Sequence, residues 1–585
     1  MRSLRLTLVL VVSLASAAVV QADTPASLIG KKIDKLSLKD IAGKTWSLPD
    51  LKDRKAVVVV FVGTQCPINN AFMPRLADLH KTYTDKGVQF LAVNANRQDD
   101  PKRIAAHAQE FAIPFPVLRD TSNVVADHFG ARRTPEVFVL DGERKICYQG
   151  RIDDQFGIGF QRPQPTRRDL AVALDELLAG KQITQATTPV AGCLIGRVAA
   201  PKNDGPITYT KQVARIVQNR CQECHRPGQV GPMPLLTYDD VSAWSETIRE
   251  VIEENRMPPW HAAPSHLKFK NDRSLSKEER ETLLAWIEKG CPKGDDKDLP
   301  APKQYAEGWN IGKPDAIFTM PAEFKVPAKA PKGGVPYKYF VTQTNLKEDV
   351  WIQAAEAKPG NKAVVHHIII YVIGKGSGVS AGDGIGNGFL VAYAPGDLGV
   401  AYPQGAAKKV PKGATIVFQM HYTPNGVEQS DRSSVGLVFA KEPPQSEVKT
   451  KSIATNNFLI PAGANNHKVT SKATFTKDAT LWALLPHMHL RGKSFEYVAV
   501  YPDGKKEVLL SVPRYDFGWQ ATYLLETPLR LPAGTRIECT AHFDNSKGNP
   551  NNPDPSQSVR WGDQTWQEMM IGFVDYAYVD GGGKR

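Results

Sequence analysis

The stretch KAVVVVFVGTQCP, residues 55–67, decides the fold of the first part of the chain. Its continuous apolar run is typical of a strand that is buried on both faces of a sheet. Segments with strand-like and helix-like patterns alternate behind it, at residues 71–87, 88–96, 101–111, 136–141 and 146–150. Strands that alternate with helices predict a βαβ unit, so we expect residues 25–180 to form an α/β domain.

The whole chain has 585 residues, which is too long for a single hydrophobic core. At roughly 150 residues per domain, this length predicts about four domains. Apolar residues make up 42% of the chain and charged residues 23%, and these ordinary fractions are compatible with globular domains throughout.

Residues 1–22 have the pattern of a signal peptide. Arg2 and Arg5 form a positive start, residues 6–20 an apolar core, and residues 20–22 a cleavage-like end. A membrane anchor is the alternative, but the apolar run is shorter than the ~20 residues that a span needs. We therefore expect an exported protein, periplasmic or secreted in a bacterium, with no membrane span after removal of the signal.

Loss of Arg2 and Arg5 with such a peptide lowers the formal net charge from +12 to +10. Acidic and basic residues are interspersed, and there is no dense basic tract. A basic surface is therefore expected, but a nucleic-acid partner is not.

Seven cysteines are few for an exported chain of this length, and their spacing does not suggest a disulfide framework. One of them, Cys193, falls in residues 181–208, which carry little periodicity and several Pro and Gly residues. We predict a linker there.

Residues 209–300 have helical patterns and contain CQECH at 221–225. Two thiols at this spacing suit thioether bonds to one heme c, with His225 as the axial iron ligand. A chance C-x-x-C or half of a zinc site is the alternative. The second axial ligand is predicted to be Met257, with Met233 and His261 as weaker candidates.

These features resemble a small class I-type cytochrome c over roughly 90 residues.

The N-terminal domain resembles the thioredoxin-like redoxins, on the basis of FVGTQCP and the Thr134-Pro135 pair. In that fold this proline is typically cis and faces the cysteine. The resemblance places Cys66 at the first-cysteine position, where a helix N-terminus lowers the thiol pKa.

Asn69 departs from the redoxin pattern, because it stands where the second cysteine of a C-x-x-C would be. Dithiol exchange would then require Cys147 or Cys193 to resolve the first cysteine. The alternative is a degenerate domain that is kept for docking or as a scaffold.

From about residue 312 onward, short alternating segments divided by Pro, Gly, Asn and Asp predict an all-β, sandwich-like structure. His487 and His489 are two positions apart, so on a strand both side chains face one metal. The adjacent His366 and His367 would need a bulge to converge. Imidazoles together with a thioether suit copper, whereas a structural zinc site would more often show thiolates.

The ordered set of histidines resembles the copper type II, ascorbate-dependent monooxygenases, the family of the peptidylglycine and dopamine hydroxylases. The resemblance implies two jelly-roll-like β-sandwiches at residues 312–442 and 445–580, each with one copper ion. It implies an electron-transfer copper held by His366, His367 and His421. It also implies an oxygen-binding, catalytic copper held by His487, His489 and Met569.

Two departures bear on the substrate. The peptide-hydroxylating members carry an Arg and a Tyr where this chain has Leu485 and Phe573. The resemblance therefore favours a small apolar or aromatic substrate over a peptide C-terminus.

The complete expectation is a multidomain oxidoreductase, ordered as thioredoxin-like α/β, all-α cytochrome c and two β-sandwiches. It would hydroxylate a C–H bond with O₂, using two copper ions and one covalent heme c. Its electrons would come through the heme, from a redox partner or an ascorbate-like reductant. The alternatives are a non-enzymatic electron-transfer or copper-handling protein, and a thiol-disulfide or peroxide reductase acting through Cys66.

Overall fold

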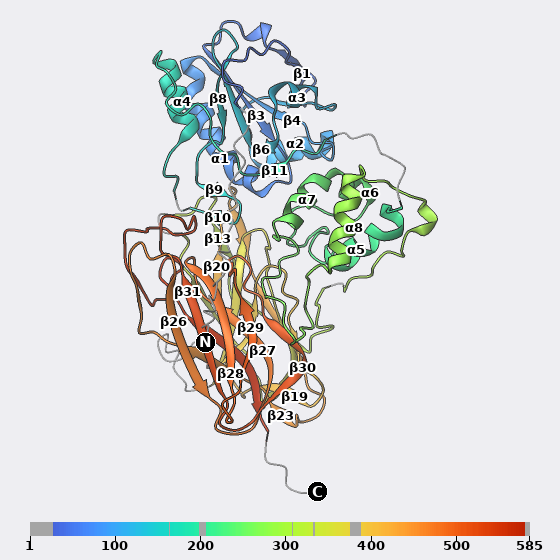
Figure 1. Cartoon of the computed structure of the whole chain (residues 1–585), viewed down its shortest axis with the longest axis vertical. Helices are drawn as coiled ribbons and strands as arrows, with labels where there is room; N and C mark the ends of the chain where they lie inside the picture. Colours follow the sequence, from blue (N-terminus) through green and yellow to red (C-terminus); the bar gives the residue numbers. More distant parts are fainter. Residues whose placement is uncertain are drawn as a thin grey trace, which may run out of the picture.

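The computed structural model describes residues 27–162, 164–197, 206–306, 308–331, 334–374 and 388–579. The expected signal peptide lies outside these residues. Figure 1 shows an α/β region, a helical region beside it and an elongated β region below both. This order confirms the coarse expectation: a thioredoxin-like α/β domain, then a mainly helical region, then a largely β region.

The α/β region is built on a five-stranded sheet in the order β5-β4-β3-β7-β8. The quoted apolar run forms β3, which lies in the middle and is buried along its whole length. β3 runs parallel to β4, and β4 runs parallel to β5. β7 is antiparallel to both of its neighbours, β3 and β8. The strands are β3 Ala56–Val62, β4 Val88–Asn94, β5 Val117–Arg119, β7 Glu136–Leu140 and β8 Ile146–Gly150.

Helices cover both faces of this sheet. Side chains of α1, α2 and α4 pack in one core, whereas α3 packs in a second core on the opposite face. The helices are α1 Pro67–Tyr83, α2 Pro101–Glu110, α3 Val124–Phe129 and α4 Asp169–Leu178. Short strand pairs complete the region: β1 Ser37–Lys39 with β2 Thr45–Ser47, β9 Phe156–Gly157 with β10 Phe160–Gln161, and β6 Arg133–Thr134 with β11 Cys193–Leu194.

The helical region has its own core around Trp286, which is fully buried. Its last helix begins at a capping box in which Ser276 and Glu279 bond each other's backbone N–H groups, as their spacing predicts. The helices are α5 Ala214–Arg220, α6 Tyr238–Ala243, α7 Ser245–Glu253 and α8 Lys277–Glu288.

The first β unit consists of two sheets around one core. One sheet has the order β14-β20-β16-β17, with β14 Lys338–Gln343, β20 Thr415–Tyr422, β16 Val365–Ile373 and β17 Phe389–Tyr393. The other has the order β12-β22-β15-β19-β23, with β12 Ala316–Thr319, β22 Ser434–Phe439, β15 Val350–Lys358, β19 Ala406–Val410 and β23 Ser446–Glu447. β18 Val400–Ala401 also pairs with β15, and β13 Phe324–Val326 pairs with β21 Gln429–Asp431 in a separate two-stranded sheet.

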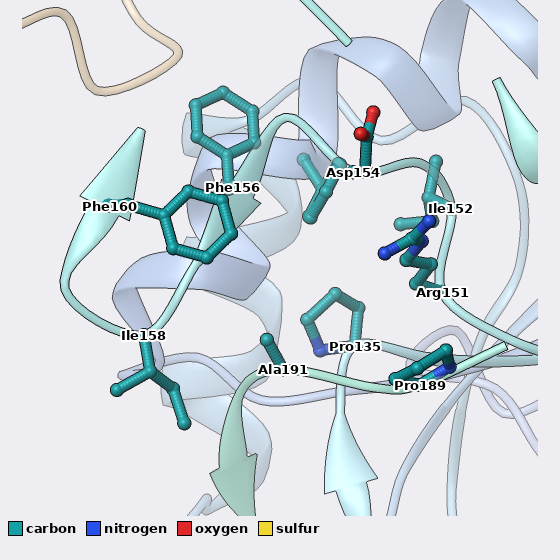
Figure 2. A pocket seen from close by; sticks show the side chains of 10 residues that line it. Pro135, Arg151, Ile152, Asp154, Phe156, Ile158, Phe160, Pro189 and Ala191 are labelled. Atoms are coloured by element: carbon teal, nitrogen blue, oxygen red, sulfur yellow. The ribbon is translucent and has the colours of Figure 1, made fainter. Parts of the chain in front are cut away.

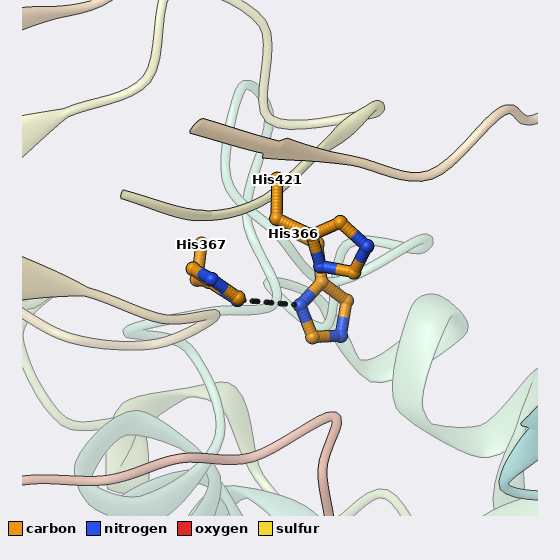
Figure 3. Close-up of side chains that lie close together, drawn as sticks. All are labelled: His366, His367 and His421. Atoms are coloured by element: carbon orange, nitrogen blue, oxygen red, sulfur yellow. Dashed lines mark hydrogen bonds between the residues drawn. The ribbon is translucent and has the colours of Figure 1, made fainter. Parts of the chain in front are cut away.

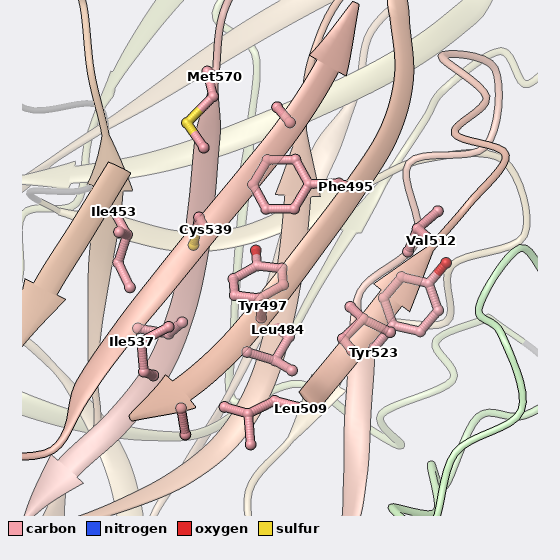
Figure 4. Packing of buried hydrophobic residues seen from close by; sticks show 14 of the residues in the cluster. Ile453, Leu484, Phe495, Tyr497, Leu509, Val512, Tyr523, Ile537, Cys539 and Met570 are labelled. Atoms are coloured by element: carbon pink, nitrogen blue, oxygen red, sulfur yellow. The ribbon is translucent and has the colours of Figure 1, made fainter. Parts of the chain in front are cut away.

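The second β unit repeats this two-sheet arrangement around the core shown in Figure 4. Its sheets have the orders β24-β33-β27-β30 and β26-β31-β28-β29. The strands are β24 Lys449–Ala454, β33 Ile571–Tyr578, β27 Ala479–His487, β30 Tyr523–Leu531, β26 His467–Thr474, β31 Arg536–Phe543, β28 Gly492–Val500 and β29 Lys506–Val512, with the short pair β25 Leu459–Ile460 and β32 Val559–Arg560.

A loop of the helical region lies against the second β unit. The amide of Ala263 donates to the Ser511 carbonyl at 2.8 Å, and Phe269 forms a bridge with Leu525 and joins the core there. The two regions are therefore packed together rather than connected only by the chain.

One expectation needs correction. Of the predicted linker, residues 181–197 are part of the α/β region, because β11 pairs with β6 and the neighbouring Val190 and Ile195 side chains are buried. The segment shows no helical or strand-like periodicity in its sequence, because just two of its residues form a strand, β11, and that strand pairs with β6, which is distant in the chain.

Candidate functional sites

Cys66 lies at the junction of β3 and α1, where it is the N-cap residue of the helix and only 1% exposed. Its thiol donates a hydrogen bond of 3.0 Å to the carbonyl of Thr134. The Thr134–Pro135 peptide bond is cis, as the redoxin resemblance implies. Asn69 is fully buried in the first turn of α1 and donates to the Gly63 carbonyl, so this residue ties the loop rather than offering a thiol.

Cys193 comes from the far end of the α/β region and reaches Cys66 through strand pairing. In the β6–β11 pair, Cys193 lies opposite Thr134. The Cys193 amide is 3.4 Å from the Cys66 sulfur, to which it donates. Cys147 instead donates its thiol to the Val139 carbonyl within the sheet. Of the two resolving candidates from the sequence, Cys193 is the one placed beside Cys66.

The two thiols differ in acidity. Burial alone raises the pKa of Cys66, but hydrogen bonds from the Cys193 thiol and from the Asn69 and Cys193 amides outweigh it and bring the pKa to about 7. The hydrogen bond that Cys193 donates to Cys66, together with burial, raises the pKa of Cys193. Cys66 is therefore the more acidic thiol of the pair and, with a pKa of about 7, is partly ionised near neutral pH, whereas Cys193 stays protonated.

A small cavity of about 80 Å³ lies next to this pair. Pro135 and Ala191, which flank the two thiol segments, form one side of it, and Phe156 and Phe160 of the β9–β10 hairpin lie across from them (Figure 2). Arg151 is the cationic side chain at its edge. The cavity is mostly apolar and has the size of a small side chain.

The CQECH motif follows α5 in a tight turn, with the His225 amide donating to the Cys221 carbonyl at 3.0 Å. The His225 Nδ1 is 3.1 Å from the Met233 carbonyl. Because a carbonyl can only accept, Nδ1 carries the proton, and Nε2 is left with a lone pair for a metal. Met233 therefore lies on the His225 side, which makes it a poor candidate for the opposite axial position.

A cavity of about 790 Å³ opens beside Cys224. Its walls come from the helical region and the first β unit, and include Arg226, Tyr305, Lys362 and Tyr393. This volume lies within the ~300–1,000 Å³ range of cofactor pockets. Of the cysteines and the histidine of CQECH, Cys224 lines this cavity.

Met257 is half-buried in the loop after α7, and its peptide bond to Pro258 is cis. His261, further along this loop, has both ring nitrogens buried without a hydrogen-bond partner among the described residues. Both side chains thus remain candidates for a metal or for contacts across the domain boundary.

His366 and His367 at the start of β16 converge with His421 at the end of β20, the neighbouring inner strand of the same sheet (Figure 3). A register shift between Val365 and His367 supplies the bulge that adjacent histidines need in order to converge. The candidate ligand atoms all lie within 4.8 Å of one another.

The two Nδ1 atoms of His366 and His367 are 3.2 Å apart. Two nitrogen ligands at ordinary metal–nitrogen distances in a tetrahedral site are about 3.3 Å apart, so this spacing fits one shared ion. Among the described residues, Nδ1 of His421 and Nε2 of His367 are buried without a hydrogen-bond partner. Burial brings the pKa of His366 to about 4, and burial together with the neighbouring histidines holds the pKa values of His367 and His421 well below the ordinary value, so the rings are neutral, as metal ligands are.

His487 ends β27 and His489 follows two positions later, with the ring centroids 5.2 Å apart. The Nδ1 of His487 is 2.6 Å from Gln520 Oε1, and that of His489 is 3.2 Å from the Gln567 carbonyl. Both Nε2 atoms are thus left for a metal. Met488 points away into the core of the second β unit, as the alternation predicts.

Met569 lies two positions before Ile571, the residue that pairs with His487 where β27 ends and β33 begins. His489 lies two positions beyond His487, so both His489 and Met569 lie just beyond this last paired position. Met569 is 4% exposed and packs with Leu485 and Phe573. The neighbouring Glu568 carboxylate accepts the amides of His489 and Arg491 at 2.9 and 2.7 Å and so holds the turn.

Aromatic rings separate the two histidine groups. Phe517 stacks on His366 at 4.9 Å and lies 6.0 Å from His489. Tyr337 lies 5.0 Å from His421 and 6.2 Å from His489. The sequence carried no signal for Phe517, Tyr337 or Gln520, because each belongs to a loop without periodicity.

Among the described residues, no helix has the length and the apolar character that crossing a bilayer requires.

A buried cysteine at the start of α1, facing a cis-proline segment, defines the N-terminal region as a thioredoxin-fold thiol domain. Residues 29–149 match the AhpC/TSA family. Thiol-disulfide oxidoreductase ResA of Bacillus thuringiensis (strain Al Hakam) is 30% identical over 128 residues, which are 22% of this chain and 72% of the relative. Through this domain the chain belongs to the AhpC/TSA redoxin family.

Two further similarities concern the same part of the chain. ResA of Bacillus subtilis (strain 168) is 32% identical over 111 residues, which are 19% of this chain and 59% of the relative. A hypothetical protein of Sinorhizobium meliloti 1021 has a solved structure that is 30% identical; the match covers 31% of this chain and 100% of that chain, with a TM-score of 0.29.

Proposed function

We propose that the N-terminal domain is a thiol-based oxidoreductase whose redox pair is Cys66 and Cys193. The observation that carries the proposal is the 3.4 Å contact between the Cys193 amide and the Cys66 sulfur. Membership of the AhpC/TSA family and similarity to thiol-disulfide oxidoreductases support it. The pair replaces the C-x-x-C dithiol that Asn69 interrupts.

In this reaction the Cys66 thiolate attacks a substrate disulfide, forms a mixed disulfide and releases one substrate thiol. Cys193 then attacks the Cys66 sulfur, which releases the second substrate thiol and leaves the Cys66–Cys193 disulfide. An external dithiol must return the pair to its reduced form. With a hydroperoxide, the Cys66 thiolate would attack the terminal oxygen and break the O–O bond, giving a sulfenic acid and the corresponding alcohol. Condensation of the sulfenic acid with Cys193 would then form the disulfide and release water.

Mass spectrometry of the oxidised full-length protein tests the pairing. We expect a Cys66–Cys193 disulfide, and disulfide reductase activity that is lost in both Cys66→Ser and Cys193→Ser. Cys147→Ser is the matched control and should retain wild-type activity. A Cys193→Ser variant with full turnover would exclude Cys193 as the resolving thiol.

We propose a second function for the β region, a copper-dependent monooxygenase. The convergence of His366, His367 and His421 within 4.8 Å favours it. Copper bound by this group and by His487, His489 and Met569 would supply one electron per site and bind O₂, so that one oxygen atom enters a C–H bond and the other leaves as water.

The protein's own residues would position the ligands and the substrate. Gln520 and the Gln567 carbonyl fix the ring orientations of His487 and His489. Leu485, Phe573 and Phe389 form an apolar surface beside these histidines, with the last two rings stacked at 5.3 Å. This surface supports a small apolar or aromatic substrate rather than a charged peptide terminus.

We also propose that the helical region carries one covalent heme c on Cys221 and Cys224, with His225 as one axial ligand and Met257 as the other. Bound there, the heme would pass single electrons. The hydrogen bond from His225 Nδ1 to the Met233 carbonyl supports this role, because it leaves the Nε2 lone pair of His225 for the iron. The donor would be a redox partner or an ascorbate-like reductant outside the cytoplasm, in the periplasm or the medium.

Metal and heme quantification on the purified protein tests these assignments. We expect two copper ions and one heme per chain. His367→Ala should lose one copper, and His487→Ala another, while the heme spectrum stays unchanged. His542→Ala, which alters a half-buried histidine bonded to Ser494, is the control. Full copper content in both ligand variants would exclude these sites.

A further inference from the structure

One short loop between β29 and β30, residues 514–520, touches both histidine groups. The Phe517 ring stacks on that of His366, with centroids 4.9 Å apart and planes at 20°. Three positions later, the Gln520 side-chain oxygen accepts a hydrogen bond from His487 Nδ1 in the 2.6 Å contact described above. The loop therefore contacts a ligand candidate of each group.

The same loop meets the helical region on its other side. The Arg514 guanidinium donates to the carbonyls of Glu254 and Asn255 at 3.5 and 3.4 Å. Both carbonyls directly precede the segment that carries Met257. Trp260 of that segment packs edge-on against Tyr523 at 5.0 Å, where the loop enters β30.

His261 and Asp516 are neighbours at this contact. Burial lowers the pKa of His261, and the charge of Asp516 opposes that effect. Asp516 in turn precedes Phe517 in the chain. The contacts between the Met257 segment and this loop are therefore the Arg514 hydrogen bonds and the packing of Trp260 on Tyr523.

We propose that loop 514–520 is the path by which electrons pass from Met257, the proposed axial ligand of the heme, to the His366, His367 and His421 group, with Phe517 as the last side chain. In each transfer one Fe(II) heme becomes Fe(III) and one Cu(II) becomes Cu(I), and no proton moves. The inference rests on the heme and copper occupancies proposed above, and assigns a residue to the link between them.

A second route leads from Cys224 toward the histidine group, through β17. A Cβ built on Gly396 would lie 3.7 Å from the Cys224 sulfur. Tyr393, three residues earlier in the chain, pairs through its backbone with Ile368, the residue after His367. This path reaches no histidine ring, whereas Phe517 stacks directly on one. The geometry therefore favours Phe517.

Single-turnover electron transfer in the full-length, heme-containing protein tests the path. The protein is loaded with Cu(II), its heme is photoreduced without oxygen, and heme absorbance and the Cu(II) electron paramagnetic resonance signal are followed together. Phe517→Leu is compared with Phe458→Leu, which removes a ring stacked on Phe543 in the same β unit. We expect Phe517→Leu to slow heme oxidation about tenfold and Phe458→Leu to leave it unchanged.

Wild-type rates in Phe517→Leu, or slowing in Tyr393→Leu instead, would overturn the inference while leaving the proposed sites intact. So would bound heme and copper that exchange no electron in the wild type. If the wild-type protein binds no copper at His366, His367 and His421, both the proposed monooxygenase and this electron path are excluded.

Should Phe517→Leu lose copper, Arg514→Ala provides an independent test, because it removes only the exposed hydrogen bonds to the helical region. It should also slow the transfer, with copper content retained. An unchanged rate in Arg514→Ala would then count against the path.

Discussion

The reactivity of Cys66 depends on groups that lie far from it in the chain. The residue itself and the start of α1 are visible in FVGTQCP, but Cys193 is 127 positions away. Burial alone would raise the pKa of Cys66 above that of a free cysteine thiol. The hydrogen bonds from Cys193 and the helix N-terminus reverse this effect, because they stabilise the thiolate more than burial destabilises it.

We predict that alkylation of Cys66 by iodoacetamide rises with pH and is half-maximal near its pKa of about 7. Cys193→Ala removes the thiol donor, so the thiolate is less favoured and the pKa moves upward. Mass spectrometry of Cys66 labelling across pH measures both profiles. Cys147→Ala should match the wild type, and a superimposable Cys193→Ala profile would contradict the prediction.

Among the secondary-structure elements, the β6–β11 pair determines whether the thiol site is complete. It holds Cys193 against Thr134, and the approach is so close that a Cβ on Gly192 would lie 2.0 Å from the Thr134 carbonyl oxygen. Gly192 also has a φ of +152°. Only glycine fits this position without displacement of β11.

Gly192→Ala should therefore separate Cys193 from Cys66 and destabilise the domain by about 1–3 kcal/mol. We expect a lower yield of the Cys66–Cys193 disulfide after mild oxidation, together with a lower Tm. Gly180→Ala is the control, since that glycine has a φ of +69° but no atom within 4 Å of an added Cβ. Equal disulfide yields in the two variants would show that β11 tolerates the methyl group.

In the molecule as a whole, a buried polar cluster ties the two β units together. Lys408 of the first unit lies 3.3 Å from Asp575 of the second, and both side chains are less than 10% exposed. Tyr402 donates to the same carboxylate at 2.6 Å, and the Thr450 hydroxyl also donates to it. Since each histidine group belongs to one unit, this cluster helps to fix the distance between the two groups.

Asp575→Asn would leave the Lys408 ammonium buried without its counter-charge. We expect a loss of about 3 kcal/mol or more in the free energy of unfolding, measured by urea denaturation. Asp478→Asn is the matched control. It breaks the exposed pair with Arg530, which should contribute at most about 1 kcal/mol. Comparable losses in both variants would argue against a structural role for the buried cluster.

The sequence alone determined the features that depend on local pattern. The apolar run of β3 and the alternation that puts His487 and His489 on one face, with Met488 on the other, were predicted, because side-chain periodicity follows directly from strand geometry. The candidate heme-binding residues and the His487 and His489 pair could likewise be identified from the sequence, since C-x-x-C-H and H-x-H are local spacings. The heme and copper assignments built on them remain proposals.

The tertiary structure alone decided which distant residues meet. It brought Cys193 out of a predicted linker to Cys66, and placed Phe517 and Gln520 on the histidines. These contacts arise from strand pairing and from packing between domains, which bring together residues with no repeating relation in sequence. A local pattern can therefore identify a cysteine or a histidine, but only the assembled fold supplies its partner.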